Sequence, residues 1–305
     1  MIEARELSKH YGDTVAVAGL TFDIRPGVVT GFLGPNGAGK STTLRMILGL
    51  DHPTAGSVRI DGRRYRDLPA PMREVGALLD ARSVHGKRTA RQHLRWIADA
   101  GALPRGRVEE VLEQVGLEDV AGRRVGGFSL GMFQRLGIAT ALLGDPGTLL
   151  FDEPMNGLDP EGIRWIRTLL QRFAAEGRTV VVSSHLMHEM EETANDVLVI
   201  GRGRLIADTT IAEFTQRAAG SHVHVASPDA ARLGALLERA GARVSTSGDD
   251  DCALAVIGLQ AARIGDLAAE HGLRVHELTP RRASLEAAFM ELTQDSVQYR
   301  PQAMA

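Results

Sequence analysis

The sequence is poor in the features that mark disulfide-stabilised and nucleic-acid-binding proteins. Its 305 residues include a single cysteine, Cys252, so an intrachain disulfide is impossible and a reducing compartment is expected. We expect Cys252 to be a small buried hydrophobic residue. The net charge of −3 at pH 7 gives no general basic surface, which disfavours a dedicated nucleic-acid binder. No nucleic-acid partner is therefore expected.

Long apolar runs are also missing. The most apolar stretches, residues 148–151 and 179–182, have the length of strands and lie beside polar motifs. No uncharged run approaches the ~20 residues that a membrane-spanning helix needs. The N-terminus lacks the apolar core of a signal peptide. We therefore expect the protein to act on a membrane only through a partner.

Lysine is rare, and one of the few lysines has an unusual setting. Only three of the 35 basic residues are lysines, namely Lys9, Lys40 and Lys87. Lys40 lies in a glycine-rich segment, which makes it a candidate functional residue.

The first 218 residues do contain a regular alternation of short apolar strands and helical segments. Hydrophobic residues make up 44% and charged residues 24%, as in ordinary globular proteins. The alternation predicts an α/β fold with a mainly parallel core sheet. We expect strands at 2–8, 14–25, 28–33, 54–62 in part, 75–79, 148–152, 179–183 and 197–200. Helices are expected from Lys40, across 89–144 with glycine-containing breaks, through 163–170 and from Leu186.

The pattern changes near residue 220. The segments that follow suggest the order β-α-β-β-α-β, over 222–227, 228–240, 242–247, 253–257, 259–271 and 273–278, with a last helix at 284–292. We therefore predict a domain at 1–218, a small α+β domain of ferredoxin-like topology at 221–293, and a flexible tail at 294–305.

The most specific motif is a phosphate-binding loop, G-x-x-x-x-G-K-S, that follows an expected strand and begins an expected helix. Its backbone N–H groups and the helix N-terminus suit phosphate oxygens. Lys40 is expected to reach the β- and γ-phosphates of a nucleotide, and the Ser41 hydroxyl to bind Mg²⁺. The candidate nucleotide-binding residues here are Gly34, Pro35, Asn36, Gly37, Ala38, Gly39, Lys40, Ser41 and Thr42.

An acidic pair ends the expected strand at 148–152. Asp152 is placed to hold Mg²⁺, directly or through water, and Glu153 to polarise an attacking water as general base. Two adjacent carboxylates at a strand tip are costly unless a cation or a proton offsets their charge. The pair therefore predicts nucleotide hydrolysis.

Further segments resemble those of ABC ATPases. Phe128 to Met132 resembles the signature loop, whose common form is LSGGQ, and Asn156 to Asp159 resembles the D-loop. His185 resembles the switch histidine, and Tyr11 resembles the aromatic residue that stacks on adenine. Together with the phosphate loop, these matches span residues 1–218 in the family's order.

The resemblance implies an ABC ATPase fold with a mainly parallel core sheet, an antiparallel β subdomain and a helical subdomain. It also implies a head-to-tail dimer with a second copy of the chain. Two ATP molecules with Mg²⁺ would then lie between the phosphate loop of one subunit and the signature loop of the other. Ser129, Gly131 and Asp159 would contribute across that interface, and His185 would contact the γ-phosphate.

Three positions depart from the family pattern. In the signature loop, Leu130 stands where a glycine is usual and Met132 where glutamine is usual. Asp80 occupies the usual position of the Q-loop glutamine. Its carboxylate is a candidate Mg²⁺ ligand, and a helix cap or solvated loop acid is the equally weighted alternative.

With these departures, and with its C-terminal segment from Leu285 to Thr293, the sequence resembles drug-resistance ATPases of the daunorubicin exporter type. That resemblance implies ATP-driven export of a drug or hydrophobic compound through separate polytopic permease subunits. It places the protein as a peripheral subunit on the cytoplasmic face of the membrane.

Two alternatives stay open. The chain could be a soluble ABC ATPase that acts on ribosomes or nucleic acid. However, the insertion before the signature loop is too short for a long coiled coil, and only one phosphate loop is present. The C-terminal domain could hold a metal at Asp249 to Asp251, although a solvated turn or a dimer-stabilising module is the simpler interpretation.

Overall fold

The computed structural model describes residues 1–217, 222–246, 252–281 and 284–293. The expected acidic turn at Asp249 to Asp251 and the expected tail at 294–305 lie outside these residues. Among the described residues, the chain divides into two compact units, the first over Met1–Thr210 and the second over 211–293. No helix among the described residues is long and apolar enough to cross a membrane.

The first unit is built on a six-stranded sheet in the order β5-β6-β7-β3-β8-β9. All neighbouring pairs are parallel except β8 with β9. Except for Asp152 at the end of β6, its central strands β3, β6 and β7 are buried and rich in Val, Leu and Phe, as expected for a sheet covered on both faces. The strands are β3 (Val29–Leu33), β5 (Val75–Leu78), β6 (Thr148–Asp152), β7 (Thr179–Ser184), β8 (Asp196–Gly201) and β9 (Arg204–Thr210).

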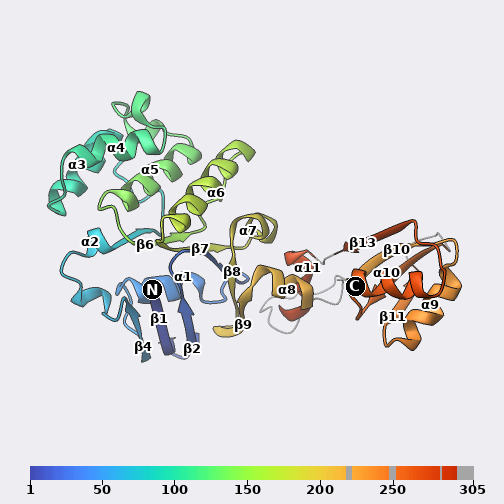
Figure 1. The fold of residues 1–305 in the computed structure, drawn as a ribbon. Coiled ribbons are helices and arrows are strands. Elements are labelled where there is room, and N and C mark those ends of the chain that lie inside the picture. The colour runs from blue at the N-terminus through green and yellow to red at the C-terminus, as the bar shows by residue number, and fades with distance from the viewer. Residues whose placement is uncertain (218–221, 247–251, 282–283, 294–305) are drawn as a thin grey trace, which may run out of the picture. The chain divides into compact units, whose positions relative to one another are not determined.

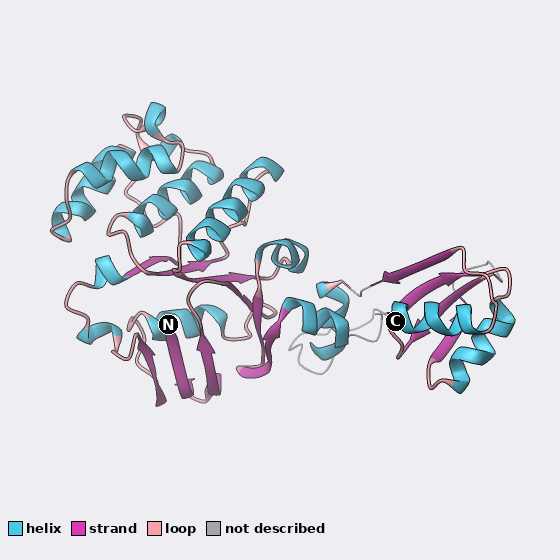
Figure 2. Ribbon diagram, in the orientation of Figure 1, coloured by secondary structure: helices cyan, strands magenta, loops and turns pink. Residues whose placement is uncertain are grey.

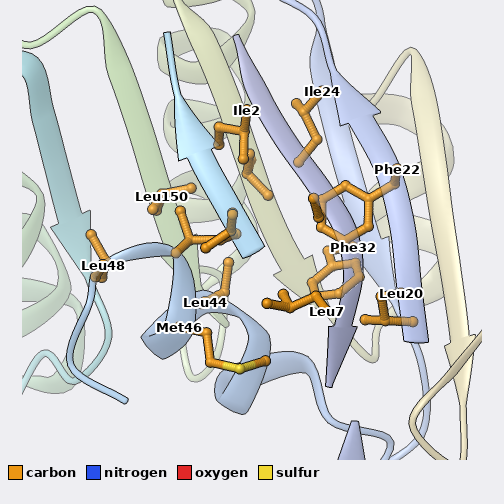
Figure 3. Packing of buried hydrophobic residues seen from close by; sticks show 14 of the residues in the cluster. Ile2, Leu7, Leu20, Phe22, Ile24, Phe32, Leu44, Met46, Leu48 and Leu150 are labelled. Carbon is orange, nitrogen blue, oxygen red and sulfur yellow. The ribbon is translucent and has the colours of Figure 1, made fainter. Parts of the chain in front are cut away.

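A second, antiparallel sheet has the order β2-β1-β4, formed by β2 (Thr14–Ile24), β1 (Ile2–Tyr11) and β4 (Ala55–Ile60). Its inward side chains share one apolar core with helix α1 (Lys40–Ile47) and with the six-stranded sheet. Figure 3 shows Leu44 and Met46 of α1 among Leu7, Leu20 and Phe32 of the strands. This packing fixes the helix that begins at the phosphate loop.

Helices fill the stretch between β5 and β6. They are α3 (Ala90–Ala100), α4 (Gly106–Gln114) and α5 (Leu130–Leu142), with 3₁₀ turns at Glu118–Val120 and Val125–Gly127. A 3₁₀ turn at Tyr65–Asp67 and the short α2 (Pro71–Glu74) come before β5. Helix α3 begins at a complete capping box made by Thr89 and Gln92. Figure 1 shows α3, α4 and α5 gathered on one side of β6 and β7, and β1, β2 and β4 on the other. Two further helices, α6 (Pro160–Ala175) and α7 (Met187–Thr193), follow β6 and β7.

The second unit contains a four-stranded antiparallel sheet with two helices packed on one face (Figure 2). The chain order is β10 (His222–Ala226), α9 (Ala230–Arg239), β11 (Arg243–Thr246), β12 (Ala253–Ile257), α10 (Ala261–Glu270) and β13 (Glu277–Arg281). The spatial order β11-β12-β10-β13 is that of a split βαβ arrangement. Helix α11 (Leu285–Thr293) contacts α8 (Ile211–Arg217).

The fold class predicted from the sequence is confirmed, and four details differ. Strand β9 was not predicted, and α8 belongs to the second unit although the predicted boundary lies after it. The last strand begins at Glu277 rather than at residue 273. The backbone N–H groups of Gly272 and Leu273 still donate to carbonyl oxygens of α10, and the Leu273 side chain packs in the apolar core of the second unit. Cys252 is exposed, so its predicted burial was wrong.

Candidate nucleotide-binding site

The candidate site lies where three neighbouring parallel strands end. In the sheet order, β7 is flanked by β6 and by β3, so their carboxyl ends meet at one edge. The phosphate loop follows β3, the acidic pair ends β6, and His185 follows β7. Open α/β sheets bind ligands at this edge. Three segments far apart in the sequence therefore converge on one place.

The phosphate loop takes a conformation that only glycine permits at two of its positions. A Cβ on Gly34 would lie 2.5 Å from the carbonyl oxygen of Ile200. Gly39 has a φ of +105°, and a Cβ there would lie 2.6 Å from the carbonyl oxygen of Ala16. The loop lines a cleft of 240 Å³ together with Ala16 and Glu153, and every residue from 35 to 42 contributes to it. The predicted residues 35–42 therefore share one small cavity, and the predicted Gly34 does not line it.

Lys40 is folded back on its own loop. Its side chain is only 6% exposed, and Nζ donates to the carbonyl oxygens of Gly34 at 2.6 Å and Pro35 at 3.3 Å. Burial lowers the pKa of Lys40, and the carboxylates of Glu153 and Asp152 oppose that shift. Its ammonium lies 3.8 Å from Oε1 of Glu153. A phosphate group in the cleft would offer this buried cation a stronger partner than the two carbonyls.

Glu153 is held between Lys40 and His185. Its Oε2 lies 2.8 Å from Nδ1 of His185, and its backbone N–H donates to both Oγ (3.0 Å) and the carbonyl oxygen (3.2 Å) of Ser183. The Ser183 hydroxyl in turn donates to Oδ1 of Asp152. One serine of β7 thus anchors both acids of β6. This residue was not singled out by the sequence, because its role depends on strand pairing.

The backbone at Glu153 is strained. Its φ is +50°, a left-handed conformation that is uncommon for residues other than glycine. Such conformations persist where the surrounding hydrogen bonds over-determine them, and they gather at functional sites. Here the two hydrogen bonds to Ser183 supply that constraint.

The signature and D-loop residues lie apart from the phosphate-loop cleft of the same subunit. Ser129 is the N-cap of α5 and accepts from the Met132 N–H at 3.3 Å. Asp159 is the N-cap of α6 and accepts from the Gly162 N–H at 2.8 Å. None of these residues, nor Gly131, lines the cleft. They are therefore candidates for a site completed by another subunit.

The unusual Leu130 contacts the D-loop. Gly157 has a φ of +71°, and a Cβ added to it would lie only 2.0 Å from Cδ2 of Leu130. A Cβ on Gly131 would lie 3.4 Å from Cδ2 of Leu158, which is an ordinary van der Waals distance. The residue that departs from the family pattern thus packs the signature helix on the D-loop of its own subunit.

Asp80 makes its hydrogen bonds within its own turn. Oδ1 accepts from the Arg82 N–H and Oδ2 from the Ser83 hydroxyl, each at 2.8 Å. Asp80 does not line the phosphate-loop cleft. This arrangement favours the turn-stabilising interpretation, and the Mg²⁺ role stays a prediction. Ser41, by contrast, does line the cleft, and Asp152 adjoins Glu153 at its edge.

Tyr11 ends β1 with its side chain 48% exposed. Its hydroxyl donates to Oδ2 of Asp51 at 2.9 Å, a residue that the sequence did not single out. About half of this residue thus stays accessible at the end of the central strand of the antiparallel sheet.

Comparisons with known proteins agree with this arrangement. A family model described as ABC transporter matches residues 17–156, and one described as a domain of unknown function (DUF8746) matches residues 221–286. The bacitracin transport ATP-binding protein BcrA of Bacillus licheniformis is 40% identical over 220 residues, covering 71% of this chain and 72% of that protein. The lantibiotic transport ATP-binding protein SrtF of Streptococcus pyogenes is 35% identical over 210 residues, covering 68% of this chain and 90% of that protein.

A solved structure has a similar fold and holds a hydrolysed nucleotide. It is a dimeric ATP-binding cassette in a post-hydrolysis state, bound to ADP and Pi, with a TM-score of 0.63 and 27% identity. It covers 69% of this chain and 99% of that chain.

The parallel sheet, the phosphate loop and the acidic pair at its edge define a P-loop ATPase. The chain belongs to the family of ABC transporter ATP-binding proteins. It is an ATP-binding and ATP-hydrolysing subunit of an ABC transporter, and its relatives favour this role over that of a soluble ABC ATPase.

Proposed function

We propose that the protein hydrolyses ATP at two composite sites in a head-to-tail homodimer, and that this drives export through separate permease subunits. The observation that carries the proposal is the position of Glu153. Its carboxylate lines the phosphate-loop cleft and lies between the ammonium of Lys40 and the ring of His185. A base, a phosphate-binding cation and a second polar group are thus within reach of one γ-phosphate.

In this scheme Glu153 accepts the proton of the attacking water as general base. His185, held at 2.8 Å from Glu153, orients that carboxylate and contacts the γ-phosphate. Lys40 leaves the carbonyls of Gly34 and Pro35 to neutralise the phosphate oxygens. The position of each residue therefore supports the role proposed for it.

The donor set suits Mg²⁺. Ser41 offers a hydroxyl and Asp152 a carboxylate, and hard cations of this size prefer oxygen ligands. No cluster of three or more metal-binding side chains occurs in the described part of the chain. That fits an ion that takes its other ligands from the nucleotide and water. When bound, Mg²⁺ would neutralise the developing phosphate charge.

The homodimer is supported by the separation of the two half-sites. Ser129, Gly131 and Asp159 lie outside the cleft of their own subunit, and the similar ATP-binding cassette bound to ADP and Pi is dimeric. Helix α5 begins at Ser129, so its N-terminus offers N–H groups and positive potential to a phosphate from the partner.

A groove in the first unit is a suitable docking site for a permease segment. It has a volume of 660 Å³ and lies between α1, β5 and α3. Two of its apolar side chains, Leu50 and Trp96, are 57% and 56% exposed. Exposed apolar patches of this kind mark interaction sites. Asp80 and Ser83 lie at the same groove, so a bound segment would contact the turn that follows β5.

Export of a drug or hydrophobic compound is favoured because relatives are named for bacitracin and lantibiotic transport. The protein would then lie on the cytoplasmic face of the membrane, held there by its permease. The soluble alternative, action on ribosomes or nucleic acid, receives no support from these relatives.

Affinity purification from solubilised native membranes tests this proposal. The tagged wild type should recover a polytopic membrane protein, and Leu50→Glu should lose it because a charge would enter the apolar groove. Met290→Glu is the matched control, since Met290 is also 57% exposed but belongs to the second unit. Recovery of ribosomes or DNA with no membrane protein would contradict the transporter role.

A further inference from the structure

The end of β1 is tied at two points to the residues that follow α1. Tyr11 donates its hydroxyl to Oδ2 of Asp51 at 2.9 Å. Lys9 donates from Nζ to the carbonyl oxygen of His52 at 2.7 Å, and the same ammonium lies 4.9 Å from the centre of the Tyr11 ring. The exposed Tyr11 side chain is thus held by a hydrogen bond at its hydroxyl and by the Lys9 ammonium over one face of its ring.

Asp51 is itself held in place. Nε of Arg45, in the last turn of α1, donates to the same Oδ2 of Asp51 at 2.7 Å. The backbone N–H groups of Leu50 and Asp51 both donate to the carbonyl oxygen of Arg45, at 2.9 and 3.3 Å. The Asp51 side chain is only 18% exposed. These contacts give the carboxylate a fixed position relative to the helix.

The electrostatics agree with a permanent charged acceptor. The hydrogen bond from Arg45 lowers the pKa of Asp51, and the hydrogen bond to Asp51 raises the pKa of the Tyr11 phenol. Asp51 therefore stays ionised and Tyr11 stays protonated near neutral pH, so the hydroxyl remains a donor.

We propose that Asp51, supported by Arg45, is a positioning residue that holds the Tyr11 ring in place to stack on the adenine of ATP. The inference rests on the proposed role of Tyr11 and adds the device that pre-orders it. Helix α1 begins at Lys40, which serves the phosphates, and ends beside Asp51, which serves the base. This one short helix therefore links the proposed phosphate-binding and base-binding parts of the site.

The physical gain is entropic. An exposed tyrosine that is free to rotate must be immobilised when a base stacks on it, and that immobilisation weakens binding. A ring that is already held avoids most of this loss. We expect Asp51→Ala and Tyr11→Phe each to raise the KM for ATP about three- to tenfold with kcat nearly unchanged. Asp51→Asn keeps an oxygen acceptor for the hydroxyl and should fall between wild type and Asp51→Ala.

The decisive experiment is a double-mutant cycle on the full chain, with the Kd for ADP measured by calorimetry beside the KM for ATP. Tyr11→Phe and Asp51→Ala remove the two ends of one hydrogen bond, so the double variant should be little worse than either single variant. Binding of inorganic triphosphate, which has no base, should be unchanged in all of them. Asp23→Ala is the matched control, because Asp23 also forms an ion pair, with Arg5, on the same antiparallel sheet.

Three outcomes would overturn the inference. A wild-type ADP affinity for Asp51→Ala would do so, and so would fully additive effects, which would mean that Asp51 acts by another route. An equal loss of triphosphate binding would indicate damage to the phosphate loop. The separate variant Tyr11→Ala tests the proposed stacking role itself, and it should weaken ADP binding about tenfold to a hundredfold. If Tyr11→Ala binds ADP normally, the stacking role fails, whatever the cycle gives.

Discussion

Single residues near the site are fixed by neighbours that are distant in the sequence. Ser183 of β7 forms hydrogen bonds with Asp152 and Glu153 at the end of the neighbouring strand β6. Asp51 accepts a hydrogen bond from the hydroxyl of Tyr11, which lies in the antiparallel sheet. Such partners are set by sheet register and by the loop after α1, which no local pattern encodes. Glu153 and His185 could be predicted because each directly follows a recognisable buried strand, and Lys40 because it ends the glycine-rich loop that follows β3.

A buried histidine gives a pH-dependent stability. His93 on α3 is 6% exposed, and its Nδ1 has no hydrogen-bond partner within the described structure. Burial lowers the pKa of His93 from its ordinary value of 6.5, and the charge of Arg88 adds to this shift. The unfolded chain therefore binds a proton near pH 6.5, whereas the folded protein binds it only at lower pH. The free energy of unfolding should fall as the pH drops below 6.5, and this contribution should be absent above it.

Replacement of His93 by Gln tests that sign. The variant should lose less stability than wild type between pH 6.5 and 5, by at most about 1.4 kcal/mol per pH unit. Urea midpoints at several pH values measure the difference, with the exposed His188→Gln as control. A steeper fall for His93→Gln than for wild type would refute the assignment.

Among the elements, the contact between the signature helix and the D-loop makes a specific prediction. Gly157→Ala should disturb the D-loop for two reasons: its φ of +71° disfavours alanine, and the new methyl group would meet Leu130. Steady-state assays should show a lower kcat, together with a loss of stability of about 1–3 kcal/mol.

The two causes can be separated. Leu130→Ala removes the steric conflict but leaves the strained φ, so the double variant should recover part of the lost activity and stability. Gly177→Ala is a control for the conformational part alone, because Gly177 has a φ of +86° and open space around it. If Gly157→Ala behaved like Gly177→Ala, the contact with Leu130 would have no energetic weight.

The elements also indicate where sequence patterns reach their limit. The buried strands β3, β6 and β7 could be predicted, since each is a short run of apolar residues before a polar motif. Strand β9 could not, because its side chains are only half-buried and it lies at the sheet edge. Strand β13, also at an edge, contains Pro280, a residue that disfavours a strand in its interior.

For the whole molecule, the division of the chain decides how a truncation should be made. Helix α8 buries Ile211 and Phe214, and α11, which contacts it, buries Leu285 and Phe289. A protein ending at residue 220 would keep α8 without α11 and expose Ile211 and Phe214, so it should aggregate. A protein ending at Thr210 leaves out the whole second unit.

We expect the protein of residues 1–210 to bind ATP with nearly the wild-type Kd but to dimerise more weakly, if the second unit stabilises the dimer. Sedimentation in the presence of ATP measures the association, and calorimetry measures the binding. The full chain purified in the same way is the reference. Equal association of the two proteins would exclude a dimer-stabilising role for the second unit.

The central claim is that ATP is hydrolysed at a site shared by two copies of the chain, with Glu153 as the base. The most direct test is the Glu153→Gln variant mixed with ATP and Mg²⁺, with mass followed by light scattering and phosphate release measured on the same sample. The account predicts a stable dimer that releases phosphate at least about a hundredfold more slowly than wild type. A monomer that hydrolyses ATP at the wild-type rate would contradict it.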